Sequence, residues 1–162
     1  MFWLGLSLIR PAAGRGGGSL VPLRRAATAL AWLVFAMALT GGLVAGIRAG
    51  FAYNTFPLMH GHVVPPEILM LEPWWRNFFE SALTVQFDHR MLAYGLFVLA
   101  ILHVIDVART ISSGPAFAGA LLLAVAIALQ AAIGITTLLY VVPLALALAH
   151  QVMAIAVLAI AV

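Results

Sequence analysis

Long uninterrupted runs of apolar residues dominate the pattern along the chain, and short polar segments separate them. Four runs are long enough to cross a bilayer, which needs about 20 apolar residues; they cover residues 26–47, 84–108, 116–140 and 144–162. Runs of this length favour helices over strands, and a helix satisfies its own backbone hydrogen bonds in lipid. The pattern therefore predicts an all-α integral membrane four-helix bundle.

The segments before and between these runs are polar or too short to span. Met1–Ile9 is apolar but too short to cross a bilayer, and no basic region or cleavage pattern marks it as a signal peptide. We expect residues 1–25 to be the end of a truncated helix followed by a Gly- and Arg-rich linker. The sequence also stops at Val162 inside an apolar run, so we expect the chain to be a fragment. Residues 26–162 form the transmembrane domain, with a long connection at 48–83.

The Arg residues give this domain a direction in the membrane. Five of them flank one side of the predicted bundle: Arg10, Arg15, Arg24, Arg25 and Arg109. The connection at 48–83 balances two Arg against three Glu, and four aromatic residues close it before the second span: Trp74, Trp75, Phe78 and Phe79. The positive-inside rule and the aromatic belt predict a cytoplasmic linker and an outer loop. The predicted location is the cell inner (plasma) membrane, or the mitochondrial inner membrane in a eukaryote.

Composition excludes several classes of protein. Hydrophobic residues make up 65% of the chain and charged residues 8%, against about 25% charged in a soluble domain. The net charge of +3 comes from scattered Arg, so no nucleic-acid-binding patch is expected. There is no Cys, which excludes thiolate ligands and iron–sulfur clusters. Redox chemistry would need a cofactor held by other residues, and His is the usual choice.

Two histidines lie at matched positions in the predicted spans. His89 is about five residues into the second span and His150 about six into the fourth, roughly 8 to 9 Å below the outer edge. Both spans run from outside to inside, so the imidazoles can face each other across the bundle and clamp a metal between them. A haem iron with two axial His suits an apolar site without Cys. Spacing alone also allows each His to be a structural, hydrogen-bonded residue.

Other polar residues in or near the spans have weaker signals. Arg48 and Arg90 are candidates to neutralise haem propionates, although Arg48 is equally an interfacial anchor. His103 lies near the inner end of the second span, where pairing with Asp106 three residues on favours a structural role. Two loop histidines, His60 and His62, are expected to be solvated rather than metal ligands. Five glycines are expected mainly to let helices approach closely: Gly41, Gly42, Gly46, Gly95 and Gly134.

Three ordered groups of motifs resemble the haem A synthase family. They occupy residues 46–59 (GIRAGFAYNTFPLM), 77–80 and 85–94 (NFFE and VQFDHRMLAY), and 134–139, 142–143 and 148–151 (GITTLL, VP and LAHQ). Together they extend over about residues 40 to 155. Two features depart from the family pattern: His60 stands where Asp or Asn is expected, and the outer-loop Cys pair of some members is absent.

The resemblance implies a specific role for the histidines. The family has eight helices in two similar halves, and this chain resembles the C-terminal half. There the two His are axial ligands of haem b, and they match His89 and His150. The N-terminal half, taken to hold the substrate haem O, has a Glu three residues before its first His; Gln86 stands there in this chain. A neutral amide is less suited to proton transfer than a carboxylate.

The implied activity is oxidation of the haem O methyl group to a formyl, which gives haem A for cytochrome oxidase. Haem O, a haem O synthase, oxidase assembly factors, membrane lipid and a second copy of the chain are the implied partners. We expect this half alone to bind haem b without making haem A. Two alternatives stay open: a non-catalytic haem b membrane cytochrome that carries electrons, and a membrane assembly subunit without a cofactor.

Overall fold

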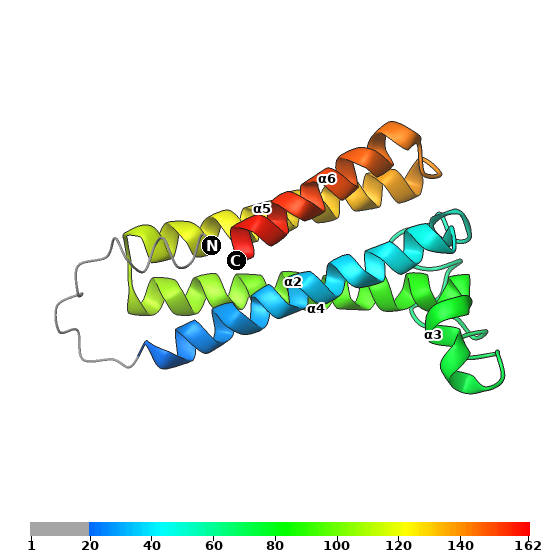
Figure 1. The fold of residues 1–162 in the computed structure, drawn as a ribbon, viewed down its shortest axis with the longest axis horizontal. Helices are drawn as coiled ribbons and strands as arrows, with labels where there is room; N and C mark the ends of the chain where they lie inside the picture. The colour runs from blue at the N-terminus through cyan, green and yellow to red at the C-terminus, as the bar shows by residue number, and fades with distance from the viewer. Residues whose placement is uncertain (1–19) are drawn as a thin grey trace.

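Four long helices make up most of the molecule. The computed structural model describes residues 20–162, and in them the long helices are α2 (Val21–Gly46), α4 (Ala82–Thr110), α5 (Pro115–Leu139) and α6 (Leu144–Ala161). Each is long and apolar enough to cross a membrane. The prediction of an all-α membrane four-helix bundle is confirmed, and the bundle is shown in Figure 1.

The first helix begins earlier than the hydrophobic pattern predicted. It starts at Val21 rather than residue 26, so residues 21–25 belong to α2 and not to a linker. Pro22 explains the start, because proline suits the first turn of a helix, where its missing N–H costs no hydrogen bond. The expectations for Met1–Ile9 and for the linker up to residue 19 lie outside the described residues.

The other spans match their predicted bounds to within two residues. Ser81 sets the start of α4, because its hydroxyl accepts a hydrogen bond from the backbone N–H of Thr84 at 3.3 Å. Gly114, with φ of +96°, and Pro115 at the first helical position separate α5 from α4. The connection after α2 was expected to be a loop, but it also contains short helical turns: η1 (Ala49–Phe51), η2 (Trp74–Arg76) and α3 (Asn77–Glu80).

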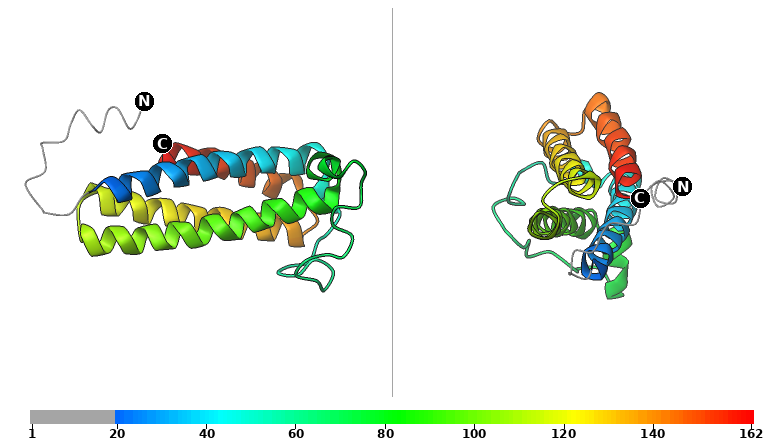
Figure 2. Two further views of the ribbon diagram at one scale, coloured as in Figure 1. Left: turned by 90° about the horizontal axis from the view of Figure 1, so that it is seen from below. Right: turned by 90° about the vertical axis from the view of Figure 1, so that its left-hand side faces the viewer.

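The helices form two antiparallel hairpins packed against each other, α2 with α4 and α5 with α6 (Figure 2). We call the end where α2 and α5 finish the loop end, because the connection 47–81 and α3 lie there. The opposite end, where α4 turns into α5, is the turn end. Both α4 and α6 start at the loop end and therefore run parallel, as the sequence predicted.

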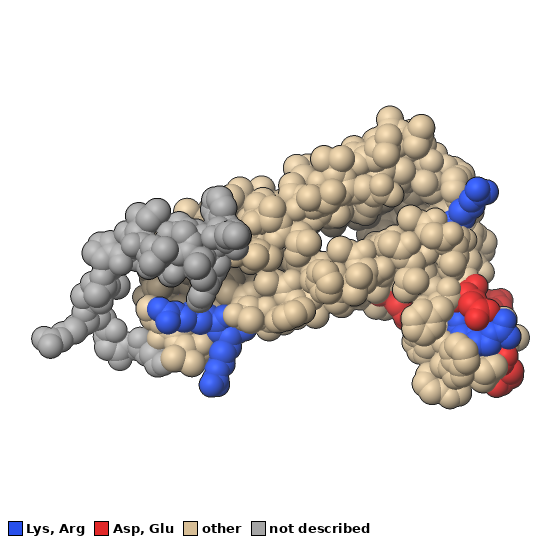
Figure 3. Space-filling model, viewed as in Figure 1, with Lys and Arg blue, Asp and Glu red and all other residues tan. Residues whose placement is uncertain are grey.

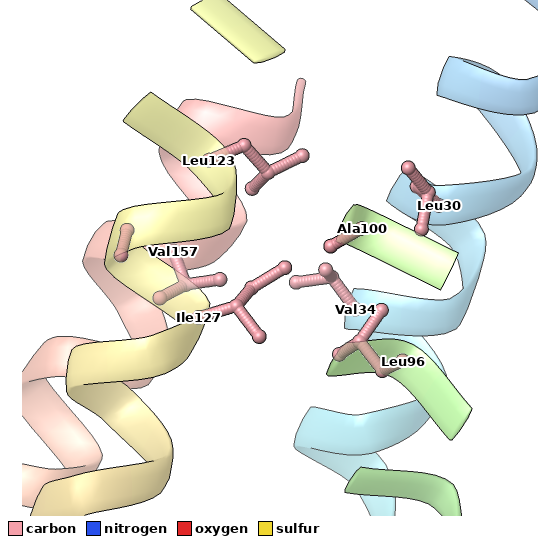
Figure 4. Close-up of a cluster of buried hydrophobic side chains, with 8 residues drawn as sticks. Leu30, Val34, Leu96, Ala100, Leu123, Ile127 and Val157 are labelled. Carbon is pink, nitrogen blue, oxygen red and sulfur yellow. The ribbon is translucent and has the colours of Figure 1, made fainter. Parts of the chain in front are cut away.

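The hydrophobic core lies between the middle of the bundle and the turn end. Figure 4 shows side chains of α5 and α6 meeting side chains of α2 and α4 across the two hairpins. The cluster consists of Leu30, Val34, Leu96, Ala100, Leu123, Ala126, Ile127 and Val157. Towards the loop end this cluster stops, and Figure 3 shows a furrow between the ridges of α2 and α6. The half of the bundle near the loop end is therefore less filled by apolar side chains.

On the face that Figure 3 draws, basic side chains lie at both ends, whereas acidic side chains lie only towards the loop end. Arg24, Arg25 and Arg109 lie at the turn end, and the Glu residues of the connection lie at the loop end. The aromatic side chains Trp74 and Trp75 are 63% and 51% exposed, as residues at a membrane interface would be. That the loop end faces outward stays a prediction.

Candidate histidine site

The two matched histidines lie at nearly equal depth in parallel helices. His89 is seven residues after Ala82, the first residue of α4, and His150 is six after Leu144, the first of α6. At a rise of about 1.5 Å per residue these positions are about 10 and about 9 Å from the helix starts. Both side chains are partly buried. The pair lies between the loop end and the apolar core.

His89 is held by two neighbouring residues of α2. Its Nδ1 lies 2.9 Å from the hydroxyl oxygen of Thr40. That hydroxyl donates its own hydrogen to the backbone carbonyl of Met37 at 3.0 Å. On the next residue, a Cβ added to Gly41 would come within 3.3 Å of His89 Cε1. The imidazole thus lies over a glycine and beside a hydroxyl of the preceding span.

His150 has the corresponding arrangement in the other hairpin. A Cβ added to Gly134 of α5 would lie 2.6 Å from His150 Cε1, closer than real Cβ atoms approach. Gln130, one turn earlier on α5, donates from Nε2 to the His150 backbone carbonyl at 3.1 Å and lies 3.4 Å from its Nε2. His150 Nδ1 and Gln130 Oε1 are buried without a hydrogen-bond partner.

These observations match what a haem between two imidazoles requires. Each ring occupies the space that a glycine leaves on its neighbouring helix, and buried polar atoms without partners mark the site. No group of three or more His, Cys, Asp or Glu side chains that could hold a metal ion occurs in residues 20–162. A free ion such as zinc needs three or four protein ligands, whereas a porphyrin supplies four of its own and needs one or two. The residues present fit a haem.

Arg90 and Gln86 are bound to the connection at the loop end. Arg90 donates to the backbone carbonyls of Tyr53 and Thr55, both at 2.9 Å, and to Gln86 Oε1 at 3.2 Å. The Gln86 amide nitrogen donates to the Ala49 carbonyl at 3.0 Å. Among the nitrogens of Arg90, Nε alone is buried without a hydrogen-bond partner in residues 20–162. Both side chains are buried, so they fix the backbone of the connection onto α4.

Arg48 differs from Arg90 in exposure and contacts. It follows α2 with φ of +57°, and its side chain is exposed. No hydrogen bond from its guanidinium to another part of residues 20–162 occurs. A role for Arg48 or Arg90 at haem propionates stays a prediction.

The remaining histidines lie apart from this site. His103 is buried in α4 with Nδ1 unpartnered, and within the described chain it forms no ion pair or hydrogen bond with Asp106. The expected His103–Asp106 pair is therefore not formed. In the connection, the His60 ring packs on Tyr53 with centroids 4.7 Å apart, and both His60 and His62 are exposed, as expected of solvated residues.

Sequence inspection missed Thr40 and gave no role to Gln130. Each is an isolated polar residue within an apolar span, and that is the signal that could have marked them. The glycines were all assigned to helix packing. That interpretation is wrong for Gly42, Gly46 and Gly95, where an added Cβ would meet nothing within 4 Å, and incomplete for Gly41 and Gly134, which face the His rings.

Comparison with known proteins shows the family of this chain. The family model described as "Cytochrome oxidase assembly protein" matches residues 1–162, the whole chain. The chain belongs to this family. Family membership and the four spans make it a multi-pass inner-membrane protein.

Several proteins that are similar to this chain carry the name "Heme A synthase". One from Nitrosospira multiformis is 52% identical over 152 residues, which are 93% of this chain and 43% of the relative. One from Rhodopseudomonas palustris is 54% identical over 84% of this chain and 38% of its own length. One from Nitrosomonas eutropha is 47% identical over 93% of this chain and 43% of its own length. The chain thus spans about two fifths of these relatives, and no solved structure matches it.

Proposed function

We propose that this chain is the C-terminal, cofactor-binding half of a haem A synthase and that His89 and His150 are the axial ligands of a haem b. The observation that carries the proposal is the placement of the two imidazoles. They lie at nearly equal depth on parallel helices of different hairpins, each against a glycine of the preceding span. The names and identities of the relatives support the same activity.

The proposed activity is oxidation of the haem O methyl group to a formyl, which yields haem A. Haem b held by this half would supply one-electron redox chemistry. The protein residues hold the cofactor: His89 and His150 bind it, Gly41 and Gly134 leave room for their rings, and the apolar spans exclude water. Haem O as substrate, and a haem O synthase, oxidase assembly factors and a second copy of the chain as partners, belong to this proposal.

Gln86 supports assigning the substrate to the other half. Its amide is neutral, and both its nitrogen and its oxygen are engaged with Ala49 and Arg90. It therefore has no proton to exchange with a substrate. The same observation favours a second candidate function, a haem b membrane cytochrome that only carries electrons.

The ligand assignment is tested by substitution of each His in the full chain. His89→Ala and His150→Ala should each abolish the low-spin, bis-imidazole absorption spectrum of the haem-loaded protein. His103→Ala is the matched control, because His103 is a buried His on α4 far along the helix from His89, and the spectrum of this variant should stay unchanged. An unchanged spectrum in either site variant would refute the pair as ligands.

Haem analysis separates synthase from cytochrome. The relatives' full-length protein and this chain are each expressed with a haem O source in a host lacking haem A, and the extracted haems are chromatographed. We expect haem b on this chain, and haem A only with the full-length protein. Haem A produced by this chain alone would contradict the division of roles between halves.

A further inference from the structure

We infer that Thr40 is a positioning residue that fixes the tautomer of His89 and so presents its Nε2 as the ligating nitrogen. The inference rests on the proposed function, because it concerns how one of the two haem ligands is prepared. It starts from the chain of two hydrogen bonds that joins His89, Thr40 and the backbone of Met37.

The direction of these bonds follows from the number of hydrogens. A threonine hydroxyl has one hydrogen, and the Thr40 hydroxyl donates it to the Met37 carbonyl at 3.0 Å. Towards His89 Nδ1, 2.9 Å away, the same oxygen can then only accept. In this arrangement His89 Nδ1 carries the proton and donates it to the Thr40 oxygen, which leaves the lone pair on Nε2. An imidazole that ligates a metal commonly has its other N–H bonded to a second residue in this way.

Gly41 lets the His89 ring lie close to α2. It follows Thr40 directly, and the space above its Cα is filled by the His89 ring, with Cε1 3.3 Å from where a Cβ would stand. The Nδ1–Cε1 edge of the ring thus lies against α2, with one hydrogen bond to Thr40 and close contact at Gly41. Rotation about χ2 to exchange the two nitrogens would break the bond to Thr40 and leave Nδ1–H unpaired in an apolar span.

His150 shows that this preparation is specific to His89. The polar side chain beside His150 is Gln130, which lies 3.4 Å from Nε2, while Nδ1 is buried without a partner. The Gln130 amide nitrogen can only donate, so this contact engages the lone pair of His150 Nε2 and leaves Nδ1–H without an acceptor. The two ligands are therefore unequal: Nδ1 of His89 has a hydroxyl acceptor that leaves Nε2 free, and Nδ1 of His150 has no acceptor among residues 20–162.

The first test uses the full chain without cofactor. Nitrogen-15 NMR of histidine-labelled protein in detergent, at a pH where imidazole is neutral, reports the tautomer of each of the five His. The His89 signals are assigned by their loss in His89→Gln. We expect the Nδ1–H form for His89 and a shift towards the Nε2–H form in Thr40→Val, with Thr40→Ser restoring the original signals.

The control for folding is Thr137→Val on α5. Thr137 is buried and its hydroxyl bonds only to the backbone carbonyl of Ile133, so the variant removes the same kind of local bond without touching His89. It should leave the His89 signals unchanged. An Nε2–H tautomer in the unaltered protein, or unchanged His89 signals in Thr40→Val, would overturn the inference.

The second test uses haem-loaded protein. In Thr40→Val the low-spin spectrum should persist, haem affinity should fall on the order of 10-fold, and the haem midpoint potential should rise, because a ligand without its N–H partner donates less charge to ferric iron. Thr40→Ser should recover both values, and equal affinities and potentials in all variants would refute the role. If the unaltered protein binds no haem through His89, the proposed function fails. The tautomer measurement without cofactor still shows whether the hydrogen bond to Thr40 sets the His89 tautomer.

Discussion

At the scale of single residues, the space beside each His ring is set by one glycine. The two glycines differ in how tightly they are covered: a Cβ would stand 2.6 Å from His150 at Gly134 but 3.3 Å from His89 at Gly41. The first distance requires the ring to move, whereas the second can be absorbed by a shift of a few tenths of an ångström. A methyl group at either position therefore probes how closely each ligand is held.

We expect Gly134→Ala to displace His150 and to weaken haem binding by on the order of 10-fold or more, with partial loss of the low-spin spectrum. Gly41→Ala should have a smaller effect of the same kind. Gly95→Ala is the control, because an added Cβ meets nothing within 4 Å there. Haem titration of the three variants measures their haem affinities. Equal affinities in all three would contradict the expected ranking.

The residue scale also shows what sequence could and could not predict about the site. The matched depth of His89 and His150 was predictable, because polar groups are rare in spans and helix rise alone fixes their depth. Thr40 and Gln130 required knowledge of which helix faces which. Sequence separation, 49 residues from Thr40 to His89, gives no such register. For Arg90, the pattern did not reveal that loop carbonyls would occupy its guanidinium.

At the scale of elements, the connection at the loop end is fixed to the bundle by buried polar side chains. Gln86 and Arg90 bind its first part to α4, and the buried Asn77 bonds the backbone of Leu71 and Trp74. Asn54 also donates to the Leu138 carbonyl of α5 at 2.9 Å, joining the connection to the second hairpin. The connection thus spans both hairpins over the His site.

Removing Arg90 should loosen this connection before it affects the helices. In Arg90→Leu, the carbonyls of Tyr53 and Thr55 lose their donor, at a cost of about 1 kcal/mol for each hydrogen bond removed. We expect faster amide exchange at residues 49–59 in the haem-free protein, and no change in Arg48→Leu, whose parent side chain is exposed. Unchanged exchange together with weaker haem binding would instead assign Arg90 to the cofactor.

The short helix α3 should respond to acid. Arg76 donates to Glu80 Oε2 at 2.6 Å, and this hydrogen bond lowers the pKa of the Glu80 carboxyl below its ordinary value. A group whose pKa is lowered by folding stabilises the fold above its ordinary pKa, and this contribution is lost as the pH falls through the lowered value. The protection of the Asn77–Glu80 amides, measured against the intrinsic exchange rate at each pH, should therefore fall on acidification, by a small amount because the pair is exposed.

Glu80→Gln supplies the control for this prediction. It removes the titrating group, so α3 should exchange faster at neutral pH and lose its dependence on acid in this range. The same acid response in Glu80→Gln as in the unaltered protein would show that another group controls α3.

At the scale of the whole molecule, orientation is the property that the charge distribution predicts most directly. The chain has no Cys, so a single introduced one is labelled uniquely. Val63→Cys, at a side chain 72% exposed in the connection, should react with an impermeant reagent from outside. Ser113→Cys, in the turn between α4 and α5, should react with this reagent only after the membrane is permeabilised. The reverse pattern would contradict the orientation.

The whole fold was the most predictable level. Four apolar runs imply four helices, and the short connections at residues 111–114 and 140–143 leave only antiparallel neighbours for α5. Helix starts were less predictable, because Pro22 and the two Arg after it extend α2 beyond its apolar run. The short turns η1, η2 and α3 were not predicted, because single polar side chains hold them: Gln86 of α4 bonds Ala49 in η1, and Asn77 bonds Trp74 in η2.

The position of the apolar core has a consequence for how the protein is assembled. Resistance to local opening follows buried apolar contacts, and these lie between the middle of the bundle and the turn end. We therefore expect the turn end to stay closed while the loop end opens more often, with the furrow between α2 and α6 on one side (Figure 3). We expect a planar, apolar cofactor to enter laterally from the lipid after all four helices are inserted. Membrane insertion and cofactor binding are then successive steps, and cofactor binding can be regulated after insertion is complete.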